Sequence, residues 1–437
     1  MKVVHFTNNL SDGAGKAAYR LHKALLEKGV ESLMLVYRGD CSDDTVIEIT
    51  GGMAAKQIVK SYKDILYRSI FDIPFYLQKA AWKLNHYRWK PSTLFNFNIP
   101  FVSIKKLHKY LHGVEIICLH SIQGVLSSSL IRDIYRVWKV PIVWTPMDIE
   151  PLTGGCHFNN ECRRFTESCG NCPQLGNERE GDISRRILDN KKKDLKNIPI
   201  TFVAGSSWVL EHIRSSSLFG SKQIKNIFLS VGQEFLKKGD KEIARETLQL
   251  PKKIKLILFG AFNLNDRRKG GQYLLMALKK LHEKLADHDR ALCDSVNLLT
   301  IGKQNGFKTN DLPFNTIHLG EIRDDRLLSL IYQASDVLAS PSIDDCGPMM
   351  VNEAYMCAIP IVAFNVGVAP DLVKSNSEGY LVKNFSVDDF SSGLFQCLFG
   401  GIDCSQDTEQ KLREECRPST QATQYISLFD ELLNNSH

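Results

Sequence analysis

Strand-like apolar runs alternate with helical patterns along most of the chain, and this alternation predicts an α/β fold with parallel sheets. The length of 437 residues favours two domains of ordinary size. The runs form two successive groups, separated by the charged segment 237–253. We therefore predict two Rossmann-like domains that face a cleft. The clearest strand-like runs are 2–6, 32–37, 114–119, 141–145, 200–204, 255–260, 296–301, 337–340 and 359–364.

The predicted domain boundaries follow these two groups of strands. Residues 1–232 form the first domain, which also carries a helical insert at 53–90 and a cysteine cluster at 156–172. Residues 233–420 form the second domain. The last segment, 421–437, is predicted to be a helix that packs back on the first domain.

The composition is typical of a soluble globular protein, with 43% apolar and 24% charged residues. No apolar run reaches the roughly 18 residues of a membrane span. The chain enters a strand at 2–6, so we expect no signal peptide and a cytoplasmic location. The net charge of +6 is spread along the chain, which does not favour nucleic acid as a partner.

A glycine-containing turn follows the first strand. Gly13 and Gly15 open the next helical pattern, and backbone without side chains can approach a phosphate or a sugar closely. The segment is not a P-loop, because Leu10 stands where the first glycine is needed and Ala17 follows Lys16. We predict a ligand contact at this turn.

The insert at 53–90 is basic and rich in aromatic residues. A basic helical segment with large apolar side chains can lie on an anionic membrane surface. An ordinary helical pair with a solvated basic face remains the alternative. Its cationic residues are Lys56, Lys60, Lys63, Arg68, Lys79, Lys83, Arg88 and Lys90, against two acids, Asp64 and Asp72.

His120 directly follows the strand-like run 114–119. The carboxyl ends of parallel strands are where ligands bind, so its imidazole is a candidate for exchanging a proton with a reacting oxygen. The alternative is a histidine that is hydrogen-bonded in a loop and has a structural role only.

Four cysteines gather in one stretch: Cys156, Cys162, Cys169 and Cys172, with His157 next to the first. Four thiolates suit tetrahedral zinc, and the close Cys169–Cys172 pair is typical of a zinc knuckle. A structural zinc ion is the preferred hypothesis. Uncoordinated thiols and an iron–sulfur cluster remain alternatives, and disulfides are disfavoured in the expected cytosol.

A basic loop, 262–271, follows the first strand of the second domain. It carries Arg267, Arg268 and Lys269 immediately before a helical pattern. Cations at this position can neutralise a diphosphate group as it leaves. The alternative is a solvated basic turn.

The most informative stretch is PSIDDCGPMMVNEA, residues 341–354. Asp345 lies on a loop after a strand, and Glu353 lies within the following helix, so the two carboxylates can accept hydrogen bonds from sugar hydroxyls. Between them, Gly347-Pro348-Met349 opens the helix, whose N-terminal N–H groups suit a diphosphate. This arrangement would hold both ends of a nucleotide sugar. A plain loop with surface acids is the alternative.

Together these segments resemble the retaining GT-B glycosyltransferases of family 4, the group 1 type, over nearly the whole chain. The likeness is greatest to bacterial enzymes of exopolysaccharide and O-antigen assembly. Four segments carry it: GAGKAAYRLHKAL (13–25), LHSIQG (119–124), the cysteine-bearing segment that starts at TPMDIEPLTGGCHF (145–158), and the segment 319–354.

The resemblance implies a role for each matching residue. Glu353 would hold the ribose, and Asp345 would contact the transferred sugar. Arg268 and Lys269 would hold the diphosphate, and His120 would lie beside the reacting centre. Catalysis of this kind requires no metal or other cofactor.

The implied function is a glycosyltransferase that works with retention at the inner face of the plasma membrane. Its donor would be a UDP- or GDP-sugar, and its acceptor a saccharide, lipid-linked in the preferred hypothesis. Several positions depart from the family pattern, among them Met147, which replaces a histidine, and Ala261, which replaces an arginine. The alternatives are therefore a nucleotide-sugar epimerase or hydrolase of the same fold, and a non-catalytic scaffold that binds nucleotide sugars.

Overall fold

The computed structural model divides the chain into two compact units. The first comprises Met1–Ala204, Val209–Asn226 and Ala422–His437, and the second comprises Gly205–Trp208 and Ile227–Gln421. The structure describes residues 1–39, 42–49, 80–81, 83–176, 178–236, 239–309, 312–374, 377–401 and 410–435.

Most of the predicted insert at 53–90 lies outside these residues, so its role stays a prediction. None of the described helices combines the length and the apolar character needed to cross a membrane.

The first unit is built on a parallel sheet of seven strands in the order β3-β2-β1-β4-β5-β6-β7. Its inner strands are buried on both faces, which explains their nearly continuous apolar sequences. The bounds are β1 Lys2–Thr7, β2 Glu31–Val36, β3 Val46–Glu48, β4 Ile116–Leu119, β5 Ile142–Trp144, β6 Ile200–Ala204 and β7 Ile224–Asn226.

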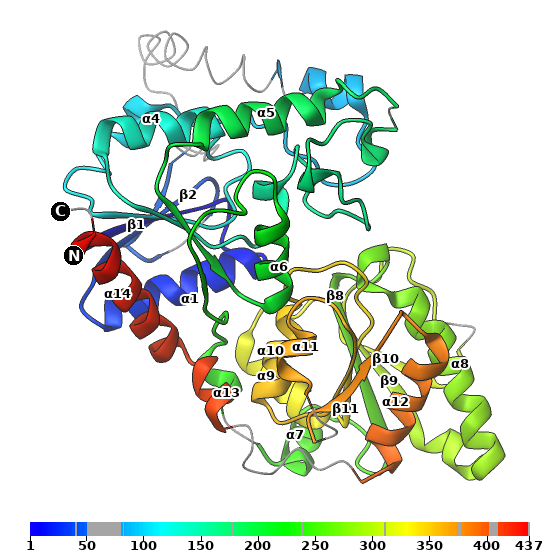
Figure 1. Cartoon of the computed structure of the whole chain (residues 1–437). Helices are drawn as coiled ribbons and strands as arrows, with labels where there is room; N and C mark the ends of the chain where they lie inside the picture. Colours follow the sequence, from blue (N-terminus) through cyan, green and yellow to red (C-terminus); the bar gives the residue numbers. More distant parts are fainter. Residues whose placement is uncertain are drawn as a thin grey trace, which may run out of the picture. The chain divides into compact units, whose positions relative to one another are not determined.

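Helices cover both faces of this sheet: α4 and α5 lie over one face, and α1 and α14 over the other (Figure 1). Helices α1, α4 and α5 each begin at a capping side chain. Asp12, Ser127 and Asp182, respectively, accept hydrogen bonds from first-turn N–H groups. The bounds are α1 Gly13–Glu27, α3 Ile104–Leu107, α4 Ser128–Trp138, α5 Ile183–Leu195, α6 Ser207–Ser215 and α14 Pro418–Asn434.

Helix α14 is bonded to the first unit by its own side chains. The Tyr425 hydroxyl lies 2.6 Å from the Thr145 hydroxyl in the buried interior. Glu431 accepts hydrogen bonds from Lys225 at 2.8 Å and from Gln223 at 2.9 Å. From Ala422 onward, this helix is therefore part of a unit whose other strands and helices all lie before residue 227.

The second unit is built on a parallel sheet of six strands in the order β10-β9-β8-β11-β12-β13. All nine strands predicted from apolar runs are present in the two sheets. The bounds in this unit are β8 Lys255–Asn263, β9 Val296–Lys303, β10 Asn315–His318, β11 Val337–Ser340, β12 Ile361–Phe364 and β13 Gly379–Val382.

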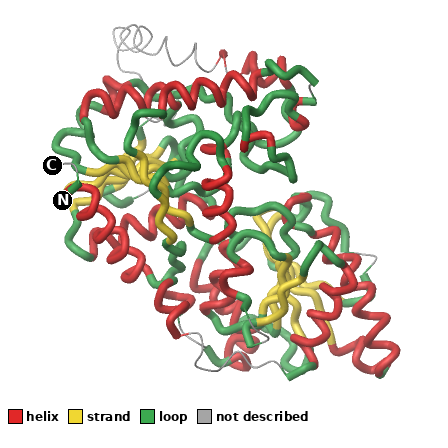
Figure 2. The backbone as a smooth tube through the Cα atoms, in the orientation of Figure 1, coloured by secondary structure: helices red, strands yellow, loops and turns green. Residues whose placement is uncertain are grey.

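Two cores lie on opposite faces of this sheet. Leu256 and Leu258 of β8 join a core with α7, α9 and α10, while Ile257 and Phe259 join a core with α8 and α12. The alternation follows from the two-residue period of a strand, and Figure 2 shows helices on both sides of the sheet. The bounds are α7 Lys241–Thr247, α8 Gly271–His288, α9 Asp325–Ala334, α10 Met349–Met356, α11 Ala369–Leu372, α12 Val387–Phe399 and α13 Gln410–Glu415.

A buried ion pair ties α7 to the two central strands of the second unit. Arg245 lies 2.6 Å from the Asp336 carboxylate and also donates to the Ala334 carbonyl at 2.9 Å. Asp336 accepts the Leu256 backbone N–H at 2.7 Å, so the carboxylate bridges the start of β11 to β8. Because both charges are buried, each depends on the other for its stability.

Replacing Arg245 with methionine should lower the free energy of unfolding by about 3 kcal/mol, because Asp336 would lose its most deeply buried partner. Urea unfolding followed by tryptophan fluorescence and circular dichroism measures this change. Lys252→Met is the control, since it removes only an exposed pair with Glu246 and should leave the transition unchanged. Equal transitions in the two variants would contradict a stabilising role for the buried pair.

Candidate functional site

In the second unit, the candidate donor residues meet at the carboxyl edge of the sheet. The strand order reverses between β8 and β11, and ligands of such sheets bind where this reversal occurs. The loop after β8 carries Arg268 and Lys269, and the loop after β11 carries Asp345. The structure brings them together, because the Lys269 ammonium forms an ion pair with the Asp345 carboxylate.

A glycine allows these two loops to touch. Gly270 has a φ of +71°, and a Cβ atom at this position would lie 1.7 Å from the Pro341 carbonyl oxygen. No other residue fits without moving the backbone. The Ile343 N–H also donates to the Arg268 carbonyl at 2.8 Å. The basic loop is therefore held directly against the loop that carries Asp345.

Both predicted diphosphate ligands already have acidic partners. Arg268 lies 2.5 Å from Asp266, and Lys269 is paired with Asp345. Burial by itself would raise the pKa of Asp345, but the charge and hydrogen bond of Lys269 hold that pKa below its usual range. Asp345 is therefore a carboxylate at neutral pH. A bound diphosphate would have to share or exchange these partners.

Helix α10 begins beside Asp345 and carries Glu353. The Gly347 N–H donates to the Asp345 carboxylate at 3.1 Å, and Pro348 provides no side-chain cap. The first turn, from Met349, thus has N–H groups without a capping side chain, as an anion site requires. Glu353 is 6% exposed, and its carboxylate accepts the Tyr332 hydroxyl at 2.9 Å. Tyr332 is a contact that sequence reasoning missed.

In the first unit, the strand order reverses between β1 and β4. Of the predicted residues, Gly15 follows β1 and His120 follows β4. A Cβ on Gly15 would lie 1.9 Å from the Asn9 carbonyl, so the turn requires glycine. Gly13 is exposed at the start of α1. The Asp12 carboxylate accepts the Gly15 N–H at 2.7 Å. Because this carboxylate is negative, the turn suits a sugar hydroxyl better than a phosphate.

His120 follows β4 as predicted, but it is only 1% exposed, whereas we expected it to face a ligand. Its backbone N–H continues the sheet by donating to the Phe6 carbonyl at 3.0 Å. Its Nε2 lies 3.0 Å from Nδ1 of His5, and the two rings are stacked. Its partner His5 belongs to the apolar strand β1, and the sequence analysis did not single it out.

The His5–His120 pair is neutral in the folded chain. Burial lowers the pKa of His120 from 6.5 to about 3 and that of His22 to about 4, and burial with His120 lowers that of His5. Within the described residues, His120 Nδ1 and His5 Nε2 have no hydrogen-bond partner. A neutral imidazole can donate or accept one hydrogen bond, so His120 can orient a hydroxyl without carrying charge.

The loop between β5 and α5 holds two polar pairs that sequence reasoning missed. His157 Nδ1 lies 2.8 Å from the Asp148 carboxylate. The Lys191 ammonium lies 2.6 Å from the Glu150 carboxylate, and both side chains are buried. Asp148, Glu150 and His157 belong to the segment TPMDIEPLTGGCHF, and Lys191 belongs to α5. Because Lys191 and Glu150 are far apart in the sequence, no local pattern predicts their pair.

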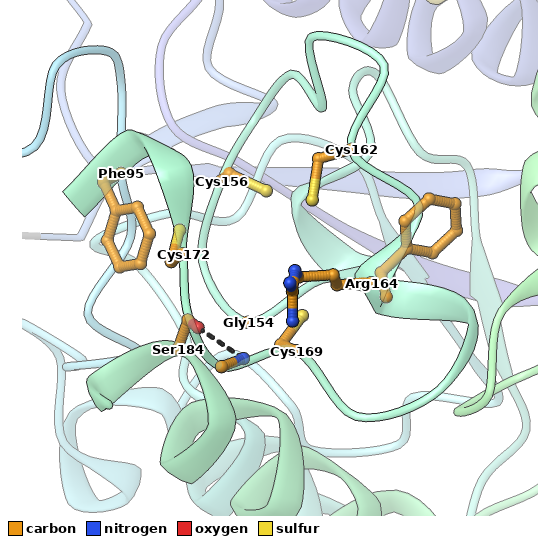
Figure 3. Close-up of a pocket in the computed structure, with 10 residues that line it drawn as sticks. Phe95, Gly154, Cys156, Cys162, Arg164, Cys169, Cys172 and Ser184 are labelled. Atoms are coloured by element: carbon orange, nitrogen blue, oxygen red, sulfur yellow. Dashed lines mark hydrogen bonds between the residues drawn. The ribbon is translucent and has the colours of Figure 1, made fainter. Parts of the chain in front are cut away.

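The four clustered cysteines line one cavity of the first unit (Figure 3). All four are free thiols. Burial raises the pKa of Cys169 to about 11, and it also raises the pKa values of Cys156 and Cys172. Among the residues that the structure describes, no three His, Cys, Asp or Glu side chains are arranged as a metal site. The predicted zinc site is therefore not preassembled.

Three of the buried histidines, His5, His22 and His120, make the first unit sensitive to acid, whereas the charge of Asp148 raises the pKa of the buried His157. In the unfolded chain each imidazole takes up a proton near pH 6.5, but the folded chain resists protonation until about pH 4 for His22 and about pH 3 for His120. Stability is therefore complete above pH 6.5 and falls as the pH decreases toward 4. Each such histidine contributes a slope of about 1.4 kcal/mol per pH unit in this window.

Urea unfolding at a series of pH values tests this slope. His120→Asn should reduce the dependence on pH, because its amide can still bond to His5 but does not titrate. His112→Asn, a change at an exposed position, is the control and should leave the slope as in the wild type. A wild-type stability that is constant between pH 6.5 and 4.5 would contradict the assignment of neutral buried imidazoles.

A family model described as "Glycosyl transferases group 1" matches residues 240–415. The colanic acid biosynthesis glycosyl transferase named WcaC of Escherichia coli K12 is 25% identical over 242 residues, 54% of this chain and 55% of that protein. A D-inositol 3-phosphate glycosyltransferase of Corynebacterium aurimucosum is 30% identical over 167 residues, 36% of this chain and 38% of that protein. The aligned regions thus span about half or less of these curated relatives.

Solved structures resemble the entire chain. Sucrose-phosphate synthase of Thermosynechococcus elongatus has a TM-score of 0.64 at 15% identity and covers 100% of both chains. Anabaena HepE in complex with UDP has a TM-score of 0.62 at 14% identity and covers 99% of this chain and 100% of that one. The predicted fold class, α/β of the GT-B type with two Rossmann-like domains, is therefore confirmed. On this fold, residues 240–415, which include Lys269, Asp345 and Glu353, match the sequence model of the group 1 glycosyl transferases.

Proposed function

We propose that this protein transfers a sugar from a nucleotide diphosphate sugar to a hydroxyl of a saccharide acceptor, with retention at the anomeric carbon. The observation that carries the proposal is the meeting of Arg268, Lys269 and Asp345 at the reversal of strand order in the second unit. These residues lie within the segment that matches the group 1 model. Cations for a diphosphate thus lie beside a carboxylate for a sugar.

The donor would be held at both ends by the second unit. Arg268, Lys269 and the first turn of α10 would bind the diphosphate, because they supply positive charge and N–H groups. Asp345 would accept hydrogen bonds from the transferred sugar, and Glu353 from the ribose. The donor class, a UDP- or GDP-sugar, is supported by the structurally similar HepE, which was solved in complex with UDP.

The reaction would proceed by stabilising the departing diphosphate. The acceptor oxygen forms a bond to the anomeric carbon while the bond to the diphosphate oxygen breaks, and the acceptor proton leaves with the diphosphate. Arg268 and Lys269 would stabilise the negative charge that develops on the leaving group. We propose no metal or other cofactor for catalysis.

The first unit would serve the acceptor. The turn at Gly13 and Gly15 would contact the acceptor sugar. His120 would act on the acceptor hydroxyl only after a rearrangement that exposes its Nδ1 atom, which is buried in the structure. The name of the similar protein WcaC refers to colanic acid, a polysaccharide. We therefore propose a lipid-linked saccharide acceptor in the biosynthesis of a cell-surface polysaccharide.

Transfer from labelled UDP- and GDP-sugars into a bacterial membrane extract tests the proposal. We expect label in a lipid-extractable glycan. Label only in an altered nucleotide sugar would instead identify an epimerase or a hydrolase, and binding without turnover would identify a scaffold. Either of these results would overturn the transferase assignment.

Glu353→Gln should weaken nucleotide diphosphate binding by about 1–3 kcal/mol, because a charge-assisted hydrogen bond to ribose becomes a neutral one. Isothermal titration calorimetry with UDP and GDP measures the affinity. Glu246→Gln, a change to an exposed acid on α7, is the control. Equal affinity of wild type and Glu353→Gln for the preferred nucleotide would remove Glu353 from the donor site.

Asp345→Asn in the same assays separates binding from turnover. It should lower turnover strongly while free nucleotide still binds, because Lys269 keeps its charge and loses a competing carboxylate. A variant with wild-type turnover would exclude Asp345 from the sugar site.

We also propose that the insert at 53–90 attaches the protein to the inner face of the plasma membrane. Binding to anionic liposomes should then decrease steeply with salt, since each basic residue near the surface contributes about 1 kcal/mol and is screened within a Debye length. Sedimentation with liposomes that contain phosphatidylglycerol measures the binding. Replacing the four lysines Lys56, Lys60, Lys63 and Lys83 with glutamine should release the protein.

The control removes four exposed lysines from the second unit instead, namely Lys252, Lys253, Lys279 and Lys308. This variant has the same net charge as the insert variant and should still bind the liposomes. Release of both variants alike would mean that binding depends on net charge and not on the insert. No binding by the wild-type protein at low salt would mean that the insert is packed against the protein.

A further inference from the structure

The cysteine cluster of the first unit encloses a small, nearly apolar cavity. Cys156, Cys162, Cys169 and Cys172 all line it, together with aromatic side chains and Arg164. Figure 3 shows the four thiols around one common space. The cavity volume of about 20 Å³ is close to that of a single water-sized sphere. A space this small can hold one ion but not a multi-iron cluster.

The backbone between the last two cysteines adopts an uncommon conformation. Cys169, Gly170 and Asn171 have φ values of +52°, +88° and +45°, so three consecutive residues lie in the left-handed region. This region is strained for the two that are not glycine, and such strain persists only where the surroundings impose it. The Gly170 N–H donates to the Ser184 hydroxyl at 3.0 Å, and the Cys172 N–H to Asp182 at 2.9 Å.

Backbone N–H groups lie near the sulfur atoms of the same two cysteines. Those of Gln174 and Leu175 lie near Cys172, and that of Gly154 lies near Cys169. N–H groups stabilise a thiolate more than a thiol, because the hydrogen bond is stronger when the acceptor is charged. Burial nevertheless raises the pKa of both thiols, so their thiolate form depends on metal binding.

Two guanidinium groups lie close to the cluster. Arg164 lines the cavity, and Arg185 Nε lies within 3.2 Å of the position that a Cβ of Gly170 would occupy. Four thiolates around one divalent cation carry a net charge of −2. Both guanidinium groups are also paired with Glu180, at 3.4 and 3.1 Å, so their charge would offset this excess only in part.

We propose that Cys156, Cys162, Cys169 and Cys172 bind one zinc ion as four thiolates. Zinc suits the site because it accepts four sulfur ligands in a tetrahedron and needs no open coordination position. In the structure the sulfurs surround the cavity without forming a metal-ligand arrangement. Binding therefore requires side-chain rotations that bring them to the cavity centre, with release of the four thiol protons.

The zinc ion would stabilise the loop that precedes the cluster. The Cys156 carbonyl accepts the Thr153 hydroxyl at 2.7 Å, and the next residue, His157, is bonded to Asp148. Fixing Cys156 thus fixes both ends of the segment 148–157. The site is structural, and its existence does not depend on the proposed transferase activity.

Metal analysis of the full chain, purified without chelator or affinity tag, tests the proposal. We expect about one zinc ion per chain and a lower melting temperature after zinc is removed. Cobalt(II) substitution should give the sulfur-to-metal charge-transfer bands and the intense visible bands of a tetrahedral four-thiolate site. The Cys169→Ser, Cys172→Ser double variant should lose the metal, whereas Cys293→Ser, a change at a buried cysteine elsewhere, should retain it.

If the double variant does not fold, Cys162→Ser and alkylation of the wild-type protein replace it. Cys162→Ser should weaken zinc binding at least tenfold, and zinc should protect four thiols from alkylation, as counted by mass spectrometry. Failure of the reduced protein to take up zinc would overturn the proposal. Bound iron with a cluster absorption band, a Cys169–Cys172 disulfide in freshly purified protein, or equal metal loss in Cys293→Ser would also overturn it.

Discussion

The parallel order of the strands is the constraint on which the candidate site depends. All strands of one sheet end at the same edge, and the loops diverge only where the order reverses, at β8 and β11 in the second unit. Lys269 and Asp345, 76 positions apart, therefore form an ion pair. The contact further requires Gly270, since any side chain there would collide with the Pro341 carbonyl. Arg245 and Asp336 support the same two strands from the opposite end of β11.

The charges of the second unit are balanced within the protein itself. Lys269 and Arg268 each have a carboxylate partner, so the site does not present bare cations to solvent. A diphosphate has to compete with Asp345 and Asp266, and the gain on binding is smaller than the Coulomb attraction alone suggests. In exchange, the cations are already positioned, which lowers the entropic cost of binding. The same argument gives Asp345 two roles, as partner of Lys269 and as ligand of the sugar.

The first unit combines its polar groups differently, by burying them in neutral form or in matched pairs. His5 and His120 share a hydrogen bond at the end of β4, and Lys191 with Glu150 forms a buried pair between the β5–α5 loop and α5. The four cysteines continue this pattern, because they are buried or half-buried thiols with amide and guanidinium groups nearby. Such groups are costly without partners, so they specify one conformation of the loop 145–172.

The sequence by itself determined the fold class, the nine inner or long strands, and the segments that carry candidate ligands, because buried parallel strands require continuous apolar runs. It missed β3, β7, β10 and β13, which are the edge strands of the two sheets. Edge strands are partly exposed, and the pattern that marks a buried strand is weak in them. Only the tertiary structure decided that His120 is buried against His5, that Lys269 pairs with Asp345, and that Tyr332 holds Glu353. These contacts join residues that are distant in sequence, and no local pattern encodes the distance between two strands or the direction of a side chain.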